Sequence, residues 1–429
     1  MADFDLVLSN ALLVNPELDS IVEGTLAVSD GRIAAMGKDV PTDSGALQID
    51  CAGACLAPGI VDIGVKIGEP GERHKESFGS AARAAAAGGV TTIVTRPDTT
   101  PPIDNPETLQ FFQQRARAAA KVRIKPMAAL TKERAGSEMT EINLLLDVGA
   151  VAFSDCDSPV RDGKVMSRCL SYCSQHGALV IGHPQEPDLS RHACATAGPF
   201  AVLMGIPTVS SQAEMMGLER DLALVAMTQA RYHADQITTA AALPVLERYL
   251  DNGCNVTAGT SIHHLTLNEF DIAGYRTFYK VKPPLRAESD RQATVDALAR
   301  GLISVISSMH TPQDEESKRL PFESAASGAV ALETLLPAAL RLHHTDGLGL
   351  PTLFRALSLN PSRLLELGTG RLSPGAPADL VLFDPDKPYT LDRTKLHSKS
   401  RNTPFDGQVL QGQVLRTFRA GQEIFRNDT

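Results

Sequence analysis

Residues 58–71 read PGIVDIGVKIGEPG, an apolar run that predicts a buried strand whose side chains alternate between two faces. Gly64 and Lys66 lie at the end of this strand and on the same face of it, because residues two apart in a strand share a face. A lysine there can pair with carboxylates or hold an anion. His310, after a later apolar run, could act as a base. Since the sequence shows no oriented partner for it, a structural histidine is the favoured interpretation.

Strand-like runs alternate with helical patterns through the middle of the chain, which predicts parallel βα units. We expect a helix at 79–87 and strands at 89–94, 122–124, 149–153, 178–181, 255–257 and 303–306. This succession predicts the α/β class and a (β/α)8 TIM barrel, whose active site would lie at the carboxyl ends of the strands. Chemistry is therefore expected in the segment after each strand.

The two ends of the chain have a different pattern. Residues 3–14 and 22–36 alternate apolar and polar side chains, and so do 378–383 and 413–418. Each pair is too small to be stable alone, so we expect the two short sheets to pack into one composite β domain. The predicted division is 1–57 and 366–429 for the two parts of a β-sandwich and 58–365 for the barrel.

The composition and net charge of the chain argue against several kinds of partner and cellular location. The 429 residues carry a net charge of −9, which argues against a nucleic-acid or anionic-membrane partner. There is no apolar run of about 18 residues, and the N-terminus is acidic where a signal peptide would be basic. The seven cysteines are expected to be free thiols in a reducing compartment. A cytoplasmic location is the expectation.

Several motifs together resemble the dihydroorotase branch of the amidohydrolase superfamily. Residues 58–71 keep the frame of its Asp-x-His-x-His-x-Arg-x-Pro-Gly signature, GGVTTIVTRPDT at 88–99 is similar to its Gly-Gly-x-Thr-Thr motif with Met-Pro-Asn-Thr, and KPPLR at 282–286 resembles its Asn-Pro-Pro-Leu-Arg. Residues 370–421 follow its C-terminal pattern. The resemblance spans nearly the whole chain and implies an amidohydrolase barrel and a place in pyrimidine biosynthesis.

The resemblance also implies a metal pair, which makes hydroxide from water and polarises the scissile amide. Four of the six ligand positions carry side chains that cannot replace the family's, and a lysine ammonium would repel a metal ion. Asp155 and His183 are the retained possible ligands, with Asp157 a nearby substitute; two ligands are fewer than a catalytic zinc requires. We therefore predict no metal, no cofactor and no catalytic residue. The six positions are Gly64, Lys66, Asp155, His183, Gln236 and Met309.

Met309 stands where the resemblance places the aspartate that is both metal ligand and general acid/base, and a thioether cannot transfer a proton. The substrate carboxylate clamp is lost as well, because its positions hold Gly68, Asp98 and Gln313. Lys282, with Lys66, restores some positive charge. Together with Arg96 and Asp98, these lysines are expected to form an internal ion network in the vacated cavity.

Three hypotheses follow. The first is a pseudoenzyme that resembles the inactive dihydroorotase-like partners of aspartate carbamoyltransferase; like related barrels, it would form homo-oligomers. The second is an active dihydroorotase or related cyclic-amide hydrolase, converting dihydroorotate to N-carbamoyl-aspartate at a rearranged zinc site. That site would use Asp155, His183, Gln236 and His310. The third is a small-molecule sensor that uses the old cavity.

Overall fold

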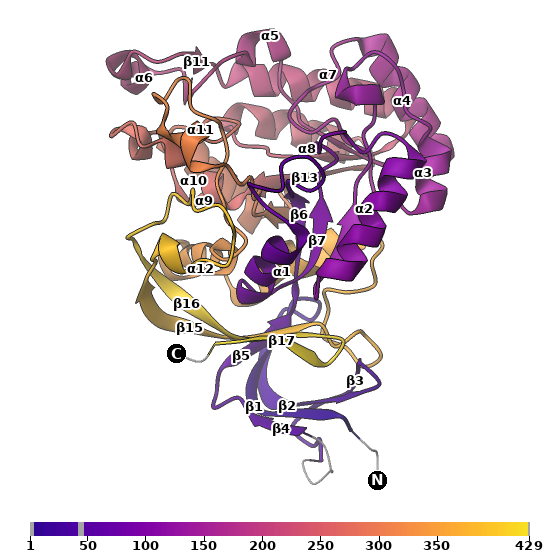
Figure 1. Cartoon of the computed structure of the whole chain (residues 1–429), viewed down its shortest axis with the longest axis vertical. Coiled ribbons are helices and arrows are strands. Elements are labelled where there is room, and N and C mark those ends of the chain that lie inside the picture. Colours follow the sequence, from indigo (N-terminus) through magenta and orange to yellow (C-terminus); the bar gives the residue numbers. More distant parts are fainter. Residues whose placement is uncertain (1–3, 42–46, 428–429) are drawn as a thin grey trace.

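The computed structural model describes residues 4–41 and 47–427. It has a barrel above and a β domain below, and the two ends of the chain meet in the β domain (Figure 1). Among these residues no helix is both long and apolar enough to cross a membrane. All seven cysteines are free, as predicted.

The β domain is one hydrogen-bonded sheet of eight strands, built from both ends of the chain. The first part and the second part meet where β5 pairs antiparallel with β15, with Leu380 opposite Pro58. The composite β domain is therefore confirmed, although its strands form one continuous sheet; the exact domain limits stay a prediction. The strands are β1 (Leu6–Asn15), β2 (Ser20–Ser29), β3 (Arg32–Gly37), β4 (Leu47–Asp50), β5 (Cys55–Pro58), β15 (Leu380–Thr390), β16 (Val409–Arg419) and β17 (Gln422–Arg426).

The barrel contains two parallel sheets, one of three strands and one of four. Phe153 joins them, because it bridges to Ala128 on one side and to Val180 on the other. The barrel closes where Lys66 N donates to His310 O over 2.8 Å. The strands are β6 (Ile60–Val65), β7 (Val90–Thr95), β8 (Arg123–Pro126), β9 (Leu179–Gly182), β12 (Arg231–Ala234), β13 (Val256–Ser261) and β14 (Val305–Ser307).

The TIM-barrel prediction is confirmed, with two local differences. The strand expected at 149–153 is wrong, because only Phe153 forms bridges there. Gly149 has φ +106° as the C-cap of the preceding helix, so the first residues of this run turn the chain and do not extend it. Strand β12 was not predicted; it is four residues long and carries a histidine, which leaves little apolar pattern to detect.

Helices cover the outside of the barrel, and the short strands β10 (Ala195–Thr196) and β11 (Thr208–Val209) lie with α6 at its upper edge (Figure 1). The helix predicted at 79–87 is confirmed as α1. The helices are α1 (Phe78–Ala87), α2 (Pro106–Ala119), α3 (Ile142–Val148), α4 (Gly163–Gln175), α5 (Pro187–Ser190), α6 (Pro199–Met204), α7 (Gln212–Thr228), α8 (Leu243–Asp251), α9 (Ile262–Thr266), α10 (Glu288–Ala299), α11 (Glu315–Arg319), α12 (Leu335–Asp346), α13 (Leu350–Phe354) and α14 (Asn360–Leu364).

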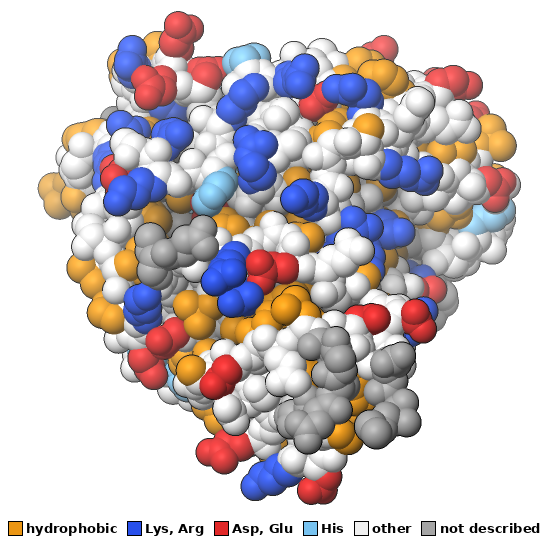
Figure 2. Space-filling view, turned by 60° about the horizontal axis from the view of Figure 1, so that its bottom comes forward, with side chains coloured by type: hydrophobic (Ala, Val, Ile, Leu, Met, Phe, Trp, Pro, Cys, Tyr) orange, Lys and Arg blue, Asp and Glu red, His pale blue; other side chains and the backbone are white. Residues whose placement is uncertain are grey.

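The surface carries mixed charges despite the negative net charge. Figure 2 shows Lys and Arg side chains spread over the upper half of one face, with acidic and hydrophobic side chains between them. This face does not present a continuous patch of one sign.

A buried ion pair between Glu214 and Arg286 ties α7 to the loops after β12 and before α10. Glu214 is 0% exposed and Arg286 is 2% exposed, and Arg286 Nη2 lies 3.2 Å from Glu214 Oε2. Glu214 also accepts hydrogen bonds of 2.8 Å from the backbone N–H groups of Thr238 and Thr239. The arginine of the KPPLR motif is therefore part of the scaffold.

Replacing Arg286 by leucine should destabilise the fold by about 3–5 kcal/mol, because it leaves the Glu214 carboxylate buried without its cation. Urea unfolding of the variant measures this loss. Arg300→Leu is the matched control, since Arg300 pairs with Glu247 at an exposed site and should change stability by less than about 1 kcal/mol. Equal losses in both variants would contradict this role of Arg286.

Candidate functional site

A small cavity of about 110 Å³ lies at the carboxyl ends of the barrel strands, and we call it the barrel centre. It collects side chains that the sequence analysis placed at six separate points of the chain. These are Lys66, Asp98, Gln236, Lys282, Met309 and Gln313. The structure thus brings together most of the predicted site positions but leaves little free volume between them.

Lys66 and Arg96 form a partly buried ion network with acidic residues of the first two loops. Lys66 Nζ lies 3.3 Å from Glu72 Oε2 and 3.3 Å from Asp98 Oδ2. Arg96 holds the same Asp98 with two hydrogen bonds, from Nε at 3.2 Å and from Nη2 at 2.9 Å. The expected ion network is present, and Glu72, which sequence reasoning did not single out, completes it.

Asp157 extends this network across the barrel. Its Oδ1 lies 3.2 Å from Arg96 Nη2, and its Oδ2 lies 3.3 Å from Lys282 Nζ. Burial raises the pKa of Asp157, but Arg96 and then Lys282 outweigh that effect and hold the pKa well below its ordinary value. Asp157 is therefore ionised and is held between the cations of Arg96 and Lys282.

Gly64 and Met309 share one space at the end of β6. Gly64 has φ +87°, and a Cβ built on it would lie 2.6 Å from Met309 Sδ. A side chain at position 64 would therefore collide with the thioether and strain the backbone. The two substitutions that the sequence shows at these ligand positions are sterically coupled.

Asp155, one of the two retained possible ligands, does not line the barrel centre. Its Oδ1 accepts hydrogen bonds of 3.0 Å from both Leu130 N and Thr131 N, and its Oδ2 accepts one from Thr131 Oγ1. Both carboxylate oxygens are thus bound to the loop after β8. The side chain at the centre is Asp157, the nearby substitute.

His183, the second retained ligand position, lines a neighbouring cavity and not the barrel centre. It is 5% exposed, and burial, followed by the charge of Lys282, lowers its pKa to about 3. Its ring is therefore neutral, and Nε2 has no hydrogen-bond partner among the described residues. Asp155 and His183 do not face a common point.

His310 faces away from the centre. It is fully buried, its Nδ1 accepts from Ala331 N at 3.1 Å, and its Nε2 lies 3.4 Å from Glu76 Oε2. Glu76 in turn accepts from Ser398 Oγ. His310 is thus structural, as favoured above, and the alternative set of Asp155, His183, Gln236 and His310 does not converge.

The remaining predicted positions stabilise the loops around the centre. Gly68 accepts from Glu72 N over 2.5 Å, and a Cβ on Gly68 would overlap Glu72 O. Gln236 Nε2 donates to Lys282 O at 3.3 Å, and Gln313 Nε2 donates to Ser327 O at 2.9 Å. The amides of Gln236 and Gln313, which could bind a carboxylate, thus donate to backbone carbonyls instead.

The described residues do not fit the metal pair that the resemblance implies. In residues 4–41 and 47–427, no three His, Cys, Asp or Glu side chains come together in a way that could hold a metal ion.

A double-mutant cycle tests the steric coupling at the end of β6. We expect Gly64→Ala to cost roughly 1–3 kcal/mol, because the new Cβ meets Met309 Sδ and the φ value is unfavourable. In a Met309→Ala background the same change should cost about 1 kcal/mol less. Urea unfolding of the four proteins gives the coupling. Strict additivity would contradict the contact.

Asp62, on β6, is the basis for a pH prediction. It is fully buried, its Oδ1 accepts from Ser308 N at 2.8 Å, and burial raises its pKa from 3.8 to about 6. Between these values the folded chain binds more protons than the unfolded chain, so stability falls as pH rises. Asp62→Asn should remove on the order of 2 kcal/mol of that fall, measured by urea unfolding from pH 4 to pH 7. Parallel curves for both proteins would refute it.

Comparisons with known proteins agree with this fold. A family model described as "Dihydro-orotase-like" matches residues 53–242. A protein named dihydroorotase from Wolbachia sp. subsp. Drosophila simulans (strain wRi) is 34% identical over 424 residues, covering 98% of this chain and 96% of the relative. Another from Aquifex aeolicus (strain VF5) is 32% identical over 422 residues, covering 98% and 99%.

Among solved structures, L-hydantoinase (dihydropyrimidinase) from Arthrobacter aurescens matches with a TM-score of 0.89 at 23% identity, covering 99% of this chain and 96% of that chain. D-hydantoinase from Thermus sp. matches with a TM-score of 0.84 at 20% identity, covering 99% and 96%. At these identities the likeness shows the fold.

These relatives correct the prediction of no cofactor. Hydrolases of the family that the motifs resemble use a metal pair, so relatives of that name over the full length favour zinc over no metal, and the prediction is wrong. With full-length relatives of this name and the same barrel, the chain belongs to the dihydroorotase family of the amidohydrolase superfamily.

Proposed function

We propose that this dihydroorotase-family protein has lost the hydrolysis of dihydroorotate and serves as a structural partner of aspartate carbamoyltransferase. The observation that carries the proposal is the packing of Met309 against Gly64, with its sulfur 2.6 Å from where a Cβ at position 64 would lie. The space that ligand and acid/base side chains take in the resemblance is filled by an apolar thioether.

The proton-transfer groups of the barrel centre support this proposal. A general acid/base must be able to exchange a proton near the working pH and reach the substrate. Met309 cannot do so, and Asp157 is held ionised by Arg96 and Lys282. His310 lies behind the centre against Glu76. His263 also lines the centre, but burial lowers the pKa of its ring to about 4, well below the working pH.

The charges of the centre also disfavour an anionic substrate there. Asp98 lies where the resemblance expects a neutral asparagine, and its carboxylate already holds Arg96 and Lys66. A carboxylate ligand would have to displace Asp98 from these cations inside a cavity of about 110 Å³. The partnership itself rests on the resemblance to inactive dihydroorotase-like proteins that assemble with the transcarbamoylase.

A second function has its own support. The names of the full-length relatives favour an active, zinc-dependent dihydroorotase or related cyclic-amide hydrolase over the first proposal. This alternative requires ligands other than the set of Asp155, His183, Gln236 and His310, because those side chains do not converge. Activity measurements decide between the two.

We expect no dihydroorotate hydrolysis above the uncatalysed rate, and no cyclisation of N-carbamoyl-aspartate, whether the protein is chelated or loaded with zinc. Both reactions are followed by absorbance of dihydroorotate, with the Aquifex aeolicus dihydroorotase as positive control. Turnover that is lost on chelation and restored by zinc would establish the second function and reject the first.

We also expect the chain to co-elute with the aspartate carbamoyltransferase of the same organism in size-exclusion chromatography at equimolar mixing. The transcarbamoylase alone and this chain alone are the controls, and mass photometry gives the stoichiometry. Separate elution, with full transcarbamoylase assembly and activity in the absence of this chain, would contradict the structural role.

A further inference from the structure

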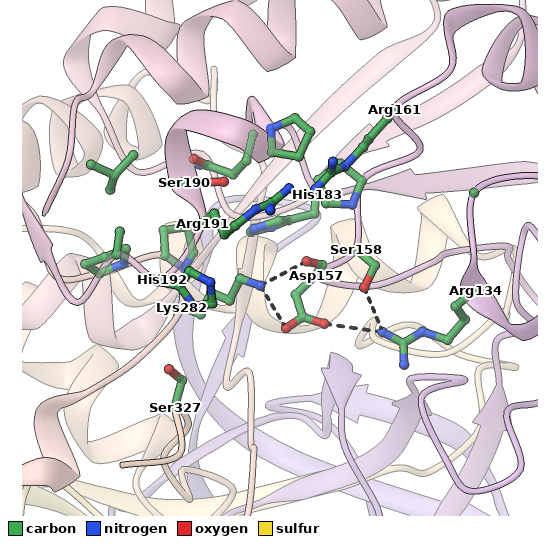
Figure 3. A pocket seen from close by; sticks show the side chains of 18 of the residues that line it. Arg134, Asp157, Ser158, Arg161, His183, Ser190, Arg191, His192, Lys282 and Ser327 are labelled. Carbon is green, nitrogen blue, oxygen red and sulfur yellow. Dashed lines mark hydrogen bonds and ion pairs between the residues drawn. The ribbon is translucent and has the colours of Figure 1, made fainter. Parts of the chain in front are cut away.

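A second and larger cavity, which we call the outer pocket, opens beside the barrel centre. Its volume is about 760 Å³, within the range of small-molecule sites. It shares Asp157, Lys282 and Ser327 with the barrel centre and is otherwise lined by other loops. Figure 3 shows basic side chains from separate segments facing this space.

On one side of the outer pocket, three cations share a single carboxylate. Arg134 Nη2 lies 3.4 Å and Arg96 Nη2 3.2 Å from Asp157 Oδ1, while Lys282 Nζ lies 3.3 Å from Asp157 Oδ2. Arg134 and Lys282 line the pocket itself. Since Arg96 is also held by Asp98, the cations that line this side of the pocket are Arg134 and Lys282, which face the single carboxylate of Asp157.

A second pair of cations lines the same pocket. Arg161 Nη1 lies 3.2 Å and Arg191 Nη2 3.0 Å from the same atom, Asp188 Oδ1. Both arginines line the pocket and are about half exposed, so their guanidinium groups are accessible. Two cations thus share one exposed carboxylate.

Other charged side chains also line the pocket. Asp162 accepts hydrogen bonds from Lys164 N and Val165 N as the N-cap of α4. Lys280 donates 2.7 Å hydrogen bonds to the backbone carbonyls of Glu323 and Ala325. In the described lining, five Lys and Arg side chains face three Asp and Glu side chains, and Asp188, which holds Arg161 and Arg191 from outside the lining, is a fourth carboxylate.

His183 provides an independent observation. It lines the outer pocket, is 5% exposed, and its Nε2 has no partner in the described part of the chain. A buried ring nitrogen without a partner is costly unless a ligand or water meets it. A neutral imidazole can donate one hydrogen bond from this position to an oxyanion.

We propose that the outer pocket binds a small polyanion, a phosphate ester or a polycarboxylate, between the Arg134–Lys282 side and the Arg161–Arg191 side, with His183 donating from the wall. Arginine forks suit the oxygens of phosphates and carboxylates, which favours this ligand class. The site goes beyond the proposed function and needs no catalysis in the barrel centre.

Isothermal titration calorimetry of the full chain with pyrophosphate and with citrate tests the proposal, and the better ligand distinguishes the phosphate from the polycarboxylate class. We expect binding that weakens with added NaCl. Arg161→Gln and Arg191→Gln should each weaken it about tenfold, the loss expected for a charge-assisted hydrogen bond. Arg300→Gln, an exposed arginine paired with Glu247 outside the pocket, should leave binding unchanged.

Urea unfolding confirms that each variant is folded. Absence of pyrophosphate and citrate binding at millimolar concentration, or binding unaffected by both pocket variants, would overturn the proposal. Binding of dihydroorotate alone would also overturn it, because that result identifies the substrate site of the family. Zinc-dependent hydrolysis would reject the proposed loss of activity but leave the outer pocket untouched.

Discussion

The partly buried ammonium of Lys66 is the constraint around which the barrel centre is arranged. A charge removed from water must be paired, and Lys66 lies 3.3 Å from both Glu72 and Asp98. Asp98 in turn holds Arg96, and Arg96 holds Asp157. The charged residues at these positions therefore form one connected network, in which each side chain is paired with the next.

The scaffold that surrounds this network is independent of it. The eight-stranded sheet from both chain ends and the Glu214–Arg286 pair between α7 and the neighbouring loops use other residues. For this reason the fold of the dihydroorotase family is retained although the centre differs from the family's motifs. The arginines of the outer pocket are likewise carried by loops of the barrel scaffold.

Gly64 and Met309 are in contact at the end of β6. A residue with a Cβ at position 64 needs space that the Met309 sulfur occupies, and the φ of +87° at Gly64 suits glycine. A side chain restored at position 64 alone therefore requires the Met309 side chain to move. The relatives favour zinc for this family. In this chain, however, the described side chains do not come together as a metal site.

By itself, the sequence determined the class of fold and the composite β domain, because hydrophobic periodicity is a local signal. The ion network around Lys66 was expected from the resemblance, which places its members at one cavity. Tertiary structure alone decided that Asp157 and not Asp155 reaches the centre, that His310 turns to Glu76, and that Phe153 joins two sheets by bridges. It also decided that Arg134, Arg161 and Arg191 meet across one cavity. These outcomes depend on where loops distant in sequence meet and which way each side chain points, and no local pattern encodes that.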